Sequence, residues 1–324
     1  MAHNAPGKHH REGISLKKLI GMFPNDDAAR KWFESKLWPQ GPYCPRCGSF
    51  NVQSNIKHKT MTHRCRDCKG QPMFSLKTGN IMEGSKLGFQ TWAIAVYLVT
   101  VNLKGVSSMK LHRDLEITQK SAWFLSHRLR KAMESGKPLF AGPTEADEFY
   151  AGGKEGNKHA AKKLNAGRGT VGKVPVAGLR DRATGKVKAQ VVPDTTRETL
   201  HRFVTEHTAE GSTVYTDEAV AYRGLPNRTH ETVRHSAGEY VKGMASTNGL
   251  ESFWATISRS HDGVFHHFSP KHLPRYVGEF ATRHNLRDLD TIDMMSAIAA
   301  GGVGKRLRYR ELIADNGLGS GARS

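Results

Sequence analysis

The chain has 324 residues, of which 37% are hydrophobic, and this combination supports a sizeable core and about two domains, which excludes a chain disordered throughout. The formal net charge is +19, of which +14 falls in residues 1–137. Lysine and arginine that neutralise phosphates release condensed counterions, so this asymmetry indicates a polyanionic partner. Ordinary solubilising surface charge is the alternative, and no segment pairs a basic face with a wide apolar face as membrane-surface helices do.

The first residues of the chain carry no recognisable targeting signal. Residues 1–13 have no apolar stretch after their charged residues, and we expect them to be disordered. The longest apolar stretch, residues 92–103, is shorter than the roughly 20 residues that cross a bilayer, so it is expected to be a buried helix. We therefore expect a cytoplasmic protein. Asn25 is the expected cap of a helix that leads into the next segment.

All four cysteines lie in one short segment, as two CxxC pairs separated by 17 residues. Each pair forms a tight turn that brings two sulfurs to one ion, and the spacing predicts a zinc ribbon within residues 14–80. Four thiolates leave no open coordination position, so the zinc is expected to be structural. Disulfides are disfavoured in a reducing compartment, and two pairs argue against a thioredoxin-like site. The expected zinc ligands are Cys44, Cys47, Cys65 and Cys68.

Two stretches of residues 14–137 carry basic residues that suit DNA. The segment between the CxxC pairs alternates as a β-hairpin does, and its Lys57 and Arg64 are candidate phosphate contacts. Residues 84–137 predict a long helix and then two short helices joined by a turn, which resembles a helix-turn-helix. A helical hairpin with a solvated basic face is the alternative. The candidate contacts in its second short helix are Lys120, Arg128, Arg130 and Lys131.

From residue 140 the pattern changes to alternating strands separated by glycine and proline. Residues 142–153 predict a strand that carries Asp147, with Glu145 and Phe149 on the same side. A hairpin at 174–193, a helix at 196–207 and a strand that ends at Asp217 follow. This order is found in ribonuclease-H-like folds. We therefore predict an α/β fold: a mixed sheet flanked by helices and preceded by the zinc ribbon and the helical module.

Three acidic residues of residues 140–290 are candidate metal ligands. Asp217 follows an apolar strand, where ligand sites of α/β sheets gather, although an aspartate is also common in turns. Glu251 lies beside the buried face of a predicted helix, although Asn248 and Glu251, three residues apart, also fit a capping box. Phosphodiester cleavage can use two divalent ions held by carboxylates. Asp147, Asp217 and Glu251 together suit that chemistry.

The chain resembles bacterial insertion-sequence transposases that join a zinc ribbon to a DDE catalytic domain. The resemblance covers residues 14–288 and is carried by CPRCG, CRDC, EADEFYAGGK, VYTDEAVAY and STNGLESFWATISRSHDGVFHHFSPKHLPRYVGEFATRHNLR. It implies a ribonuclease-H-like fold, Mg²⁺ dependence, binding to inverted-repeat ends, and cleavage followed by strand transfer. The family's three acids correspond to Asp147, Asp217 and Glu251.

The chain departs from the family pattern at two positions, and it has two further basic regions. Some relatives use asparagine in the third catalytic role, which makes Asn248 a candidate beside Glu251, and Ser246 stands where a histidine is expected. The glycine-rich segment 152–174 follows the first catalytic strand and is suited to a DNA backbone. A downstream histidine cluster is a candidate phosphate site, with solvated loop histidines as the alternative. The candidate contacts in these two regions are Lys162, Lys163, Arg168, His266, Lys271, His272 and Arg275.

We therefore predict a transposase that uses two Mg²⁺ or Mn²⁺ ions to cleave the ends of an insertion sequence and to transfer the 3′-OH strands into target DNA. The alternatives are a non-catalytic DNA-binding regulator and a nuclease without strand-joining activity. Double-stranded DNA and further copies of the chain are the expected partners, at the nucleoid, with no membrane and no small-molecule substrate. The expected divisions are 1–13, 14–80, 84–137, 140–290 and a disordered basic tail, 299–324.

Overall fold

A computed structural model describes residues 13–134, 136, 138–153, 160, 163–164, 169–217, 219–232 and 248–319. The chain divides into two compact units, which are described separately. Unit 1 consists of residues 1–134 and 286–314, and unit 2 consists of residues 135–285 and 315–324. The chain therefore returns to the first unit at residue 286, and its last residues, 315–324, belong to the second unit again.

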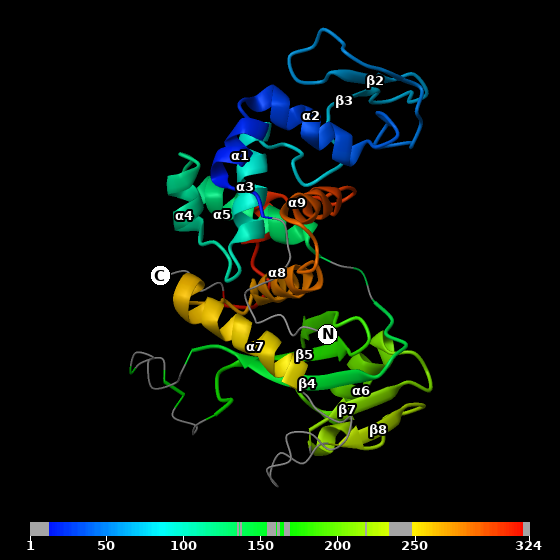
Figure 1. Cartoon of the computed structure of the whole chain (residues 1–324), viewed down its shortest axis with the longest axis vertical. Coiled ribbons are helices and arrows are strands. Elements are labelled where there is room, and N and C mark those ends of the chain that lie inside the picture. The colour runs from blue at the N-terminus through cyan, green and yellow to red at the C-terminus, as the bar shows by residue number, and fades with distance from the viewer. Residues whose placement is uncertain are drawn as a thin grey trace. The chain divides into compact units, whose positions relative to one another are not determined.

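Unit 1 combines a three-stranded antiparallel ribbon with a group of helices (Figure 1). The ribbon strands are β1 (Val52–Gln53), β2 (His63–Cys65) and β3 (Met73–Phe74). The helices are α1 (Leu16–Met22), α2 (Asp26–Leu37), α3 (Phe89–Val101), α4 (Ser108–Asp114), α5 (Gln119–Ala132), α9 (Thr291–Ala300) and α10 (Tyr309–Ile313).

Side-chain caps mark the starts of α1, α2, α4 and α5 in unit 1. The Asn25 Oδ1 accepts a hydrogen bond from the Ala28 N–H at 2.9 Å, so the predicted cap of α2 is confirmed. The Ser107 hydroxyl caps α4 in the same way through Lys110, at 3.2 Å. Residues 89–101 form the expected buried helix, because nearly every face of α3 meets the core.

Ribbon and helices of unit 1 share one hydrophobic core. Cys44 and Phe74 of the ribbon belong to the same buried cluster as Trp92 of α3, Leu125 of α5 and Ile298 of α9. The structure therefore groups residues 14–80 with residues 84–134 of the expected helical module 84–137 in one unit.

The C-terminal tail is ordered where the sequence led us to expect disorder. Residues 299–319 lie among the described residues, and Leu307 and Leu312 are 3% and 0% exposed. The Tyr309 ring of α10 lies edge-on to Phe124 of α5, with 5.4 Å between ring centroids. The expectation is wrong for residues 299–319 because these few apolar side chains find partners in unit 1 that the local glycine-rich composition does not reveal.

Unit 2 is built on a five-stranded mixed sheet with the strand order β6-β5-β4-β7-β8. β4 pairs antiparallel with β5 and parallel with β7, and β7 pairs parallel with β8. The sequence predicted the first four strands and missed the short edge strand β8. The strands are β4 (Thr144–Ala151), β5 (Val174–Asp181), β6 (Val187–Val191), β7 (Thr213–Thr216) and β8 (Thr229–Thr232).

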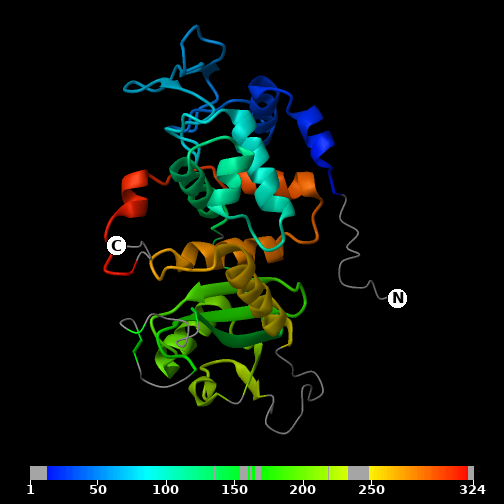
Figure 2. The ribbon, with the colours of Figure 1, turned by 90° about the vertical axis from the view of Figure 1, so that its left-hand side faces the viewer.

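Helices cover the sheet of unit 2 on both faces, as expected of a ribonuclease-H-like fold. α7 (Asn248–Ser260) and α8 (Leu273–Asn285) lie over one face (Figures 1 and 2) and bury Val176, Trp254 and Phe280 with it. α6 (Arg197–His207) packs on the opposite face, where its Leu200 lies in a separate buried cluster with Ala146 of β4. Successive residues of β4 therefore face different helices, since side chains alternate along a strand.

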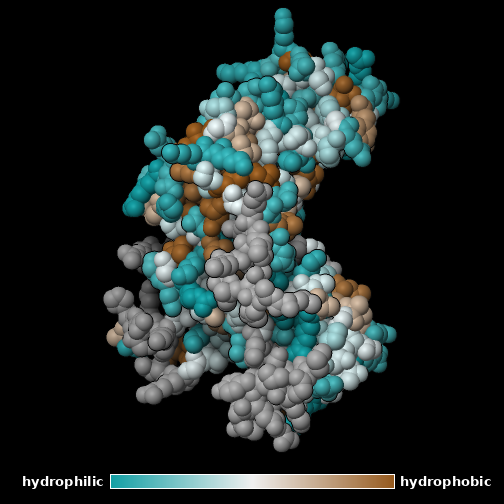
Figure 3. Space-filling model, viewed as in Figure 1, coloured by the Kyte–Doolittle hydropathy of each residue, from teal (hydrophilic) through white to brown (hydrophobic). Residues whose placement is uncertain are grey.

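Polar residues predominate among the described residues on the face shown in Figure 3. In the part of the chain that the structure describes, no helix has the length and apolar character needed to cross a membrane. On the face shown in Figure 3, hydrophilic residues cover most of the ribbon.

Candidate active site and zinc site

The four cysteines converge on one point at the end of the ribbon. Their sulfurs all lie within 4.8 Å of one another, with 3.5 Å between Cys44 and Cys68 and 3.6 Å between Cys47 and Cys65. A tetrahedron with zinc–sulfur bonds of about 2.3 Å has edges of about 3.8 Å, so the sulfurs fit one zinc ion. None of the four forms a disulfide, which would need sulfurs about 2.05 Å apart. The predicted structural zinc site fits this geometry.

The first two candidate acids lie side by side on neighbouring parallel strands. Glu145 of β4 pairs with Tyr215 of β7. Two residues further along each strand, this register brings Asp147 level with Asp217, which follows the last residue of β7. The Asp217 Oδ1 accepts a hydrogen bond from the Ala219 N–H at 3.0 Å, which holds the carboxylate at the strand end.

Asp147 is the electrostatic centre of this acidic site. Its Oδ1 accepts a hydrogen bond from the Glu148 N–H at 2.9 Å, and its Oδ2 accepts one from the Trp254 indole N–H at 3.0 Å. Burial raises the pKa of Asp147 from 3.8 to about 6, and the charges of Asp217 and Glu251 act in the same direction. The charges of both other candidate acids therefore reach Asp147.

Trp254 connects the helix that carries Glu251 to Asp147. Glu251 is exposed and lies one helical turn before Trp254 on α7. The Trp254 ring stacks on Phe149 of β4, with 5.4 Å between ring centroids, while its N–H donates to Asp147. Because the indole is fixed at both its face and its N–H, α7 is held where the charge of Glu251 still acts on Asp147.

A glycine on β5 makes room for the indole. Gly178 pairs directly with Asp147 across the sheet. A Cβ atom at Gly178 would lie 2.7 Å from the Trp254 Cη2, closer still to Cζ2, and 3.2 Å from Leu250 Cδ2. Only a residue without a side chain allows this approach. The sequence placed Trp254 on a buried helix face but gave no signal for the contact with Gly178.

Glu145 anchors the start of α7. Its side chain is 3% exposed and accepts hydrogen bonds from Arg180 Nη1 at 3.0 Å and Arg182 Nε at 3.2 Å. Its other oxygen accepts the Leu250 N–H at 3.3 Å, one of the amides that a helix start leaves unsatisfied. Gly249 lies so close to Arg180 that a Cβ there would be 2.6 Å from the Arg180 Cδ. The sequence located Glu145 on the correct side of the strand but did not reveal this role.

A half-buried acid, Glu148, lies on the opposite face of β4. The pKa of Glu148 is raised to about 7, chiefly by burial and also by the charges of Asp147 and Asp217. Its carboxyl is hydrogen-bonded to Tyr222, which is 1% exposed and whose own pKa is raised by burial. The sequence analysis missed both residues, since nothing in the local pattern distinguishes them from ordinary sheet residues.

The donor set of the acidic site fits a divalent cation, although the carboxylates do not meet as closely as the sulfurs do. Among the described residues, only the four cysteines converge closely enough to share one ion as they stand. Carboxylate oxygens are the ligands that Mg²⁺ and Mn²⁺ prefer. α7 begins at Asn248, but the Asn248 side chain and Ser246 lie outside what the structure describes. The choice between Asn248 and Glu251 therefore stays a prediction.

Comparisons with known proteins match both the cysteine segment and the domain that carries the acids. Residues 24–71 match the transposase zinc-ribbon domain, and residues 140–285 match the ISXO2-like transposase domain. An uncharacterized protein in transposable element ISH50 of Halobacterium salinarum is 30% identical over 283 residues, which cover 82% of this chain and 93% of that protein. The chain belongs to the ISXO2-like transposase family.

A solved structure with a weaker likeness is a chain of the simian T-cell lymphotropic virus intasome in complex with the PP2A regulatory subunit B56 gamma. The match covers 59% of this ISXO2-like chain and 65% of that chain, at 13% identity and a TM-score of 0.28. A likeness this low carries no argument about the transposase.

Two predicted DNA contacts of this ISXO2-like chain are buried instead of exposed. Arg128 and Arg130 of α5 are 6% and 4% exposed. Arg128 donates to the Glu83 carbonyl at 2.9 Å and lies over the Phe124 ring, and burial lowers its pKa to about 10. Arg130 donates to the Ser126 hydroxyl at 3.2 Å. Their assignment to DNA is wrong for this structure, because both side chains are enclosed by unit 1.

The remaining candidates of unit 1 differ in their surroundings. The Lys120 ammonium lies over the Tyr309 ring, 4.7 Å from its centroid, and Lys131 forms an ion pair with Glu134 at 2.6 Å. The predicted contacts of unit 1 that are exposed are Lys57, Arg64 and Lys120.

The predicted DNA contacts of unit 2 also differ in their exposure. His266 is exposed and lines a cavity of about 630 Å³ together with Phe149 of β4. His272 is buried, with Nδ1 at 3.3 Å from Nη1 of the half-buried Arg275, so the expected phosphate contact through His272 is wrong for this structure. Lys163 is exposed, Lys271 is half-buried, and Lys162 and Arg168 lie outside the described residues.

The raised pKa of Asp147 predicts a stability gain on neutralisation. A folded state whose carboxyl has its pKa raised from 3.8 to about 6 binds more protons than the unfolded state, so the cost is fully present above that pKa and disappears below the unfolded pKa. Without divalent ions, Asp147→Asn should therefore increase the free energy of unfolding of unit 2 at about pH 8, by at most about 3 kcal/mol. The thermal unfolding midpoint should rise accordingly. Calorimetry at about pH 8 and about pH 5 measures the gain, which should shrink at the lower pH.

The control for this measurement is Glu210→Gln, which removes an exposed acid of the same unit. It should leave the midpoint unchanged at both pH values. An equal gain for Asp147→Asn at both pH values would contradict an electrostatic origin.

Proposed function

We propose that this chain is a transposase that cleaves DNA at the ends of its insertion sequence and joins the freed 3′-OH ends to target DNA. The observation that carries the proposal is the meeting of Asp147 and Asp217 on neighbouring parallel strands, with Glu251 near enough to raise the pKa of Asp147. These residues belong to a domain of the ISXO2-like transposase family. Mg²⁺ or Mn²⁺ ions held there would polarise the attacked phosphate and offset the charge that develops in the transition state.

The residues of the chain prepare the site for this chemistry. Asp147 has to lose its proton to bind a cation, and the N–H groups of Glu148 and Trp254 stabilise its ionised form. The Ala219 N–H orients Asp217. In the cleavage step water attacks a phosphate at the element end and a 3′-OH leaves. In the joining step that 3′-OH attacks a target phosphate, and one bridging P–O bond forms as another breaks.

The proposal also assigns partners and a place of action. Two element ends have to be held together for joining, so we expect a homo-oligomer on double-stranded DNA, in the cytoplasm at the nucleoid. The zinc ribbon of unit 1 is expected to contribute to end binding, because the matched domain is a transposase zinc ribbon.

The test is an assay with purified protein, labelled duplexes that contain the DNA flanking its coding region, and an unlabelled target plasmid. The proposal predicts nicked ends and labelled plasmid only when Mg²⁺ or Mn²⁺ is added. Cut ends that never join to the plasmid would identify a nuclease without joining activity. Binding without cleavage at any protein concentration would identify a non-catalytic DNA-binding protein. Either of these outcomes would overturn the proposal.

A further inference from the structure

A basic cavity in unit 1 is lined by none of the DNA contacts predicted from the sequence and by none of the zinc ligands. It has a volume of about 630 Å³ and lies between α2, the loop before β2, the loop after β3 and the start of α3. Its lining includes a single acid, Glu83. The cations of its wall are Arg30, Arg46, Lys59, Lys77 and Arg306.

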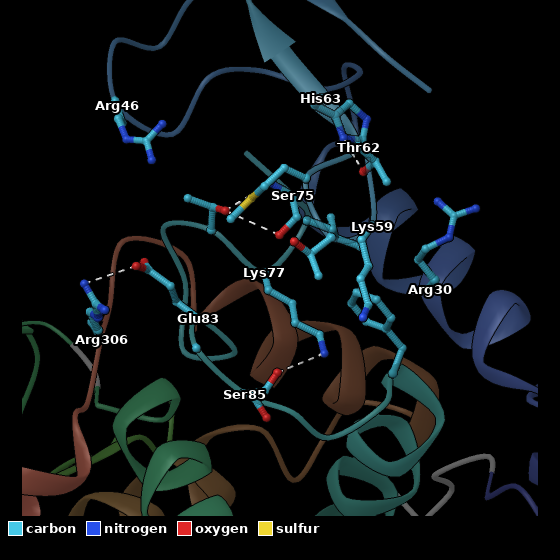
Figure 4. Close-up of a pocket in the computed structure, with 16 residues that line it drawn as sticks. Arg30, Arg46, Lys59, Thr62, His63, Ser75, Lys77, Glu83, Ser85 and Arg306 are labelled. Atoms are coloured by element: carbon cyan, nitrogen blue, oxygen red, sulfur yellow. Dashed lines mark hydrogen bonds and ion pairs between the residues drawn. The ribbon is translucent and has the colours of Figure 1, made fainter. Parts of the chain in front are cut away.

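The cations come from different sides of the cavity. Figure 4 shows Lys77 in its centre, Lys59 and Arg30 on the side of α2, and Arg46 and Arg306 on the other side. Residues distant in the sequence therefore converge on one concave surface, which is a different arrangement from scattered solubilising charge.

Two of these cations are fixed without being neutralised. The Lys77 ammonium donates to the carbonyls of Ser85 and Leu87, at 3.3 and 2.6 Å. Arg46 Nη1 donates to the carbonyls of Gln71 and Met73, the latter at 3.2 Å. Carbonyl oxygens carry no net charge, so both side chains are held in place while their positive charge remains available to a ligand. This arrangement lowers the entropy that each side chain loses when it binds an anion.

The other cations differ in availability. Arg306 pairs with Glu83 at 3.1 Å, and Arg30 pairs with Asp27 and Glu34 at 2.9 and 2.8 Å. Lys59 is exposed, and no described ion pair involves it. The uncompensated charge of the cavity is therefore supplied by Arg46, Lys59 and Lys77.

The polar groups of the wall also suit an oxyanion. The hydroxyl-bearing residues Thr60, Thr62, Ser75 and Thr78 line the same space. A concave surface with several cations and hydroxyl donors matches a phosphodiester, which offers charge and acceptor oxygens but no donor. Arg128 and Arg130 are buried and cannot contribute to such a surface, whereas the cations of this cavity line a concave one.

We propose that this cavity binds the phosphate backbone of duplex DNA. The proposal rests on the proposed function, since it assigns the DNA at the element end as the ligand. Phosphate contacts fix the position and register of a protein on the duplex without reading its sequence. The cavity accordingly supplies salt-dependent affinity, and the base-specific contacts lie elsewhere.

The experiment measures DNA binding by the full chain, without divalent cations, through fluorescence anisotropy of a labelled duplex that contains the DNA flanking its coding region. Kd is followed across a series of salt concentrations for the wild type, Lys59→Gln, Arg46→Gln and their combination. Each phosphate contact removed lowers the slope of log affinity against log salt by about 1. We expect a loss of about 2 in slope for the combination, with affinity weakened at least about tenfold at moderate salt.

The control is Lys104→Gln, which removes one exposed charge of unit 1 outside the cavity. It should leave slope and Kd close to the wild-type values. Because Arg46 supports the ribbon, its variant is first compared with the wild type by thermal unfolding, and Lys59→Glu against Lys104→Glu provides a second pair that alters exposed residues alone. Slopes for the Lys59 variants equal to those of the Lys104 variants would overturn the proposal.

The experiments distinguish an error in the cavity proposal from an error in the proposed transposase function. Cavity variants that bind as the wild type does, in a protein that joins ends, would exclude the cavity and leave the transposase. Cavity variants that lose binding, in a protein that never cleaves, would support the cavity and exclude the catalytic function.

Discussion

Replacing Gly178 with alanine is expected to reduce end cleavage by about a hundredfold while leaving DNA binding unchanged. The added Cβ would lie 2.7 Å from the Trp254 Cη2, and a rigid ring stacked on Phe149 cannot yield by a simple rotation. The indole has to move away, which breaks its hydrogen bond to Asp147 and shifts Glu251 on the same helix. Overpacking of this kind costs about 1–3 kcal/mol of stability, so the variant should still fold.

Two further variants make this prediction specific. Gly278→Ala lies in α8 of the same unit, where an added Cβ meets nothing within 4 Å, and it should leave cleavage unchanged. Trp254→Phe keeps an aromatic ring but removes the donor to Asp147, so it should lower cleavage by less than Gly178→Ala does. Wild-type cleavage by Gly178→Ala, measured as the single-turnover rate, would show that the indole does not position the acids.

The features that the sequence predicted correctly depend on local spacing. Two CxxC pairs define a zinc ribbon regardless of the rest of the chain, and the structure brings Cys44, Cys47, Cys65 and Cys68 together as expected. Alternation and turn residues placed the strands that carry Asp147 and Asp217. The side-chain period of a strand also put Glu145 and Asp147 on the same face.

The contacts that the sequence did not predict join distant segments. Gly178 and Trp254 are 76 positions apart in the sequence, and only the folded sheet shows why one must be small. The hydrogen bond from the Leu250 N–H to Glu145 joins residues 105 positions apart. A periodic pattern indicates which face of an element is buried but not what it packs against.

The burial of Arg128 and Arg130 was not predicted for a related reason. On a helical pattern, Arg128 and Arg130 appear as polar positions available to solvent. In the folded unit their long side chains reach the Glu83 carbonyl and the Ser126 hydroxyl, and such acceptors make burial tolerable. The acceptor in the loop at Glu83 cannot be identified from the helix that carries Arg128.

Replacing any of the three acids is expected to have the largest effect on activity. Asp147→Asn, Asp217→Asn and Glu251→Gln each keep the size of the side chain but remove its charge. Loss of one carboxylate ligand costs about 4 kcal/mol of transition-state stabilisation, which corresponds to about a thousandfold in rate. DNA binding should remain, because the acids lie in unit 2 and the basic cavity proposed to bind phosphates lies in unit 1.

Asn248→Ala distinguishes the two candidates for the third role. If Glu251 is the ligand, Glu251→Gln should abolish cleavage, and Asn248→Ala should reduce it only modestly through a weaker start of α7. The reverse ranking would assign the third role to Asn248.

The most direct measurement is the single-turnover rate of Mg²⁺-dependent strand transfer by Asp217→Asn, with Glu210→Gln as the exposed-acid control. The account predicts that Asp217→Asn binds the element end with wild-type affinity but transfers its strand at least about a thousandfold more slowly, while Glu210→Gln transfers at the wild-type rate. Strand transfer by Asp217→Asn at the wild-type rate would contradict it.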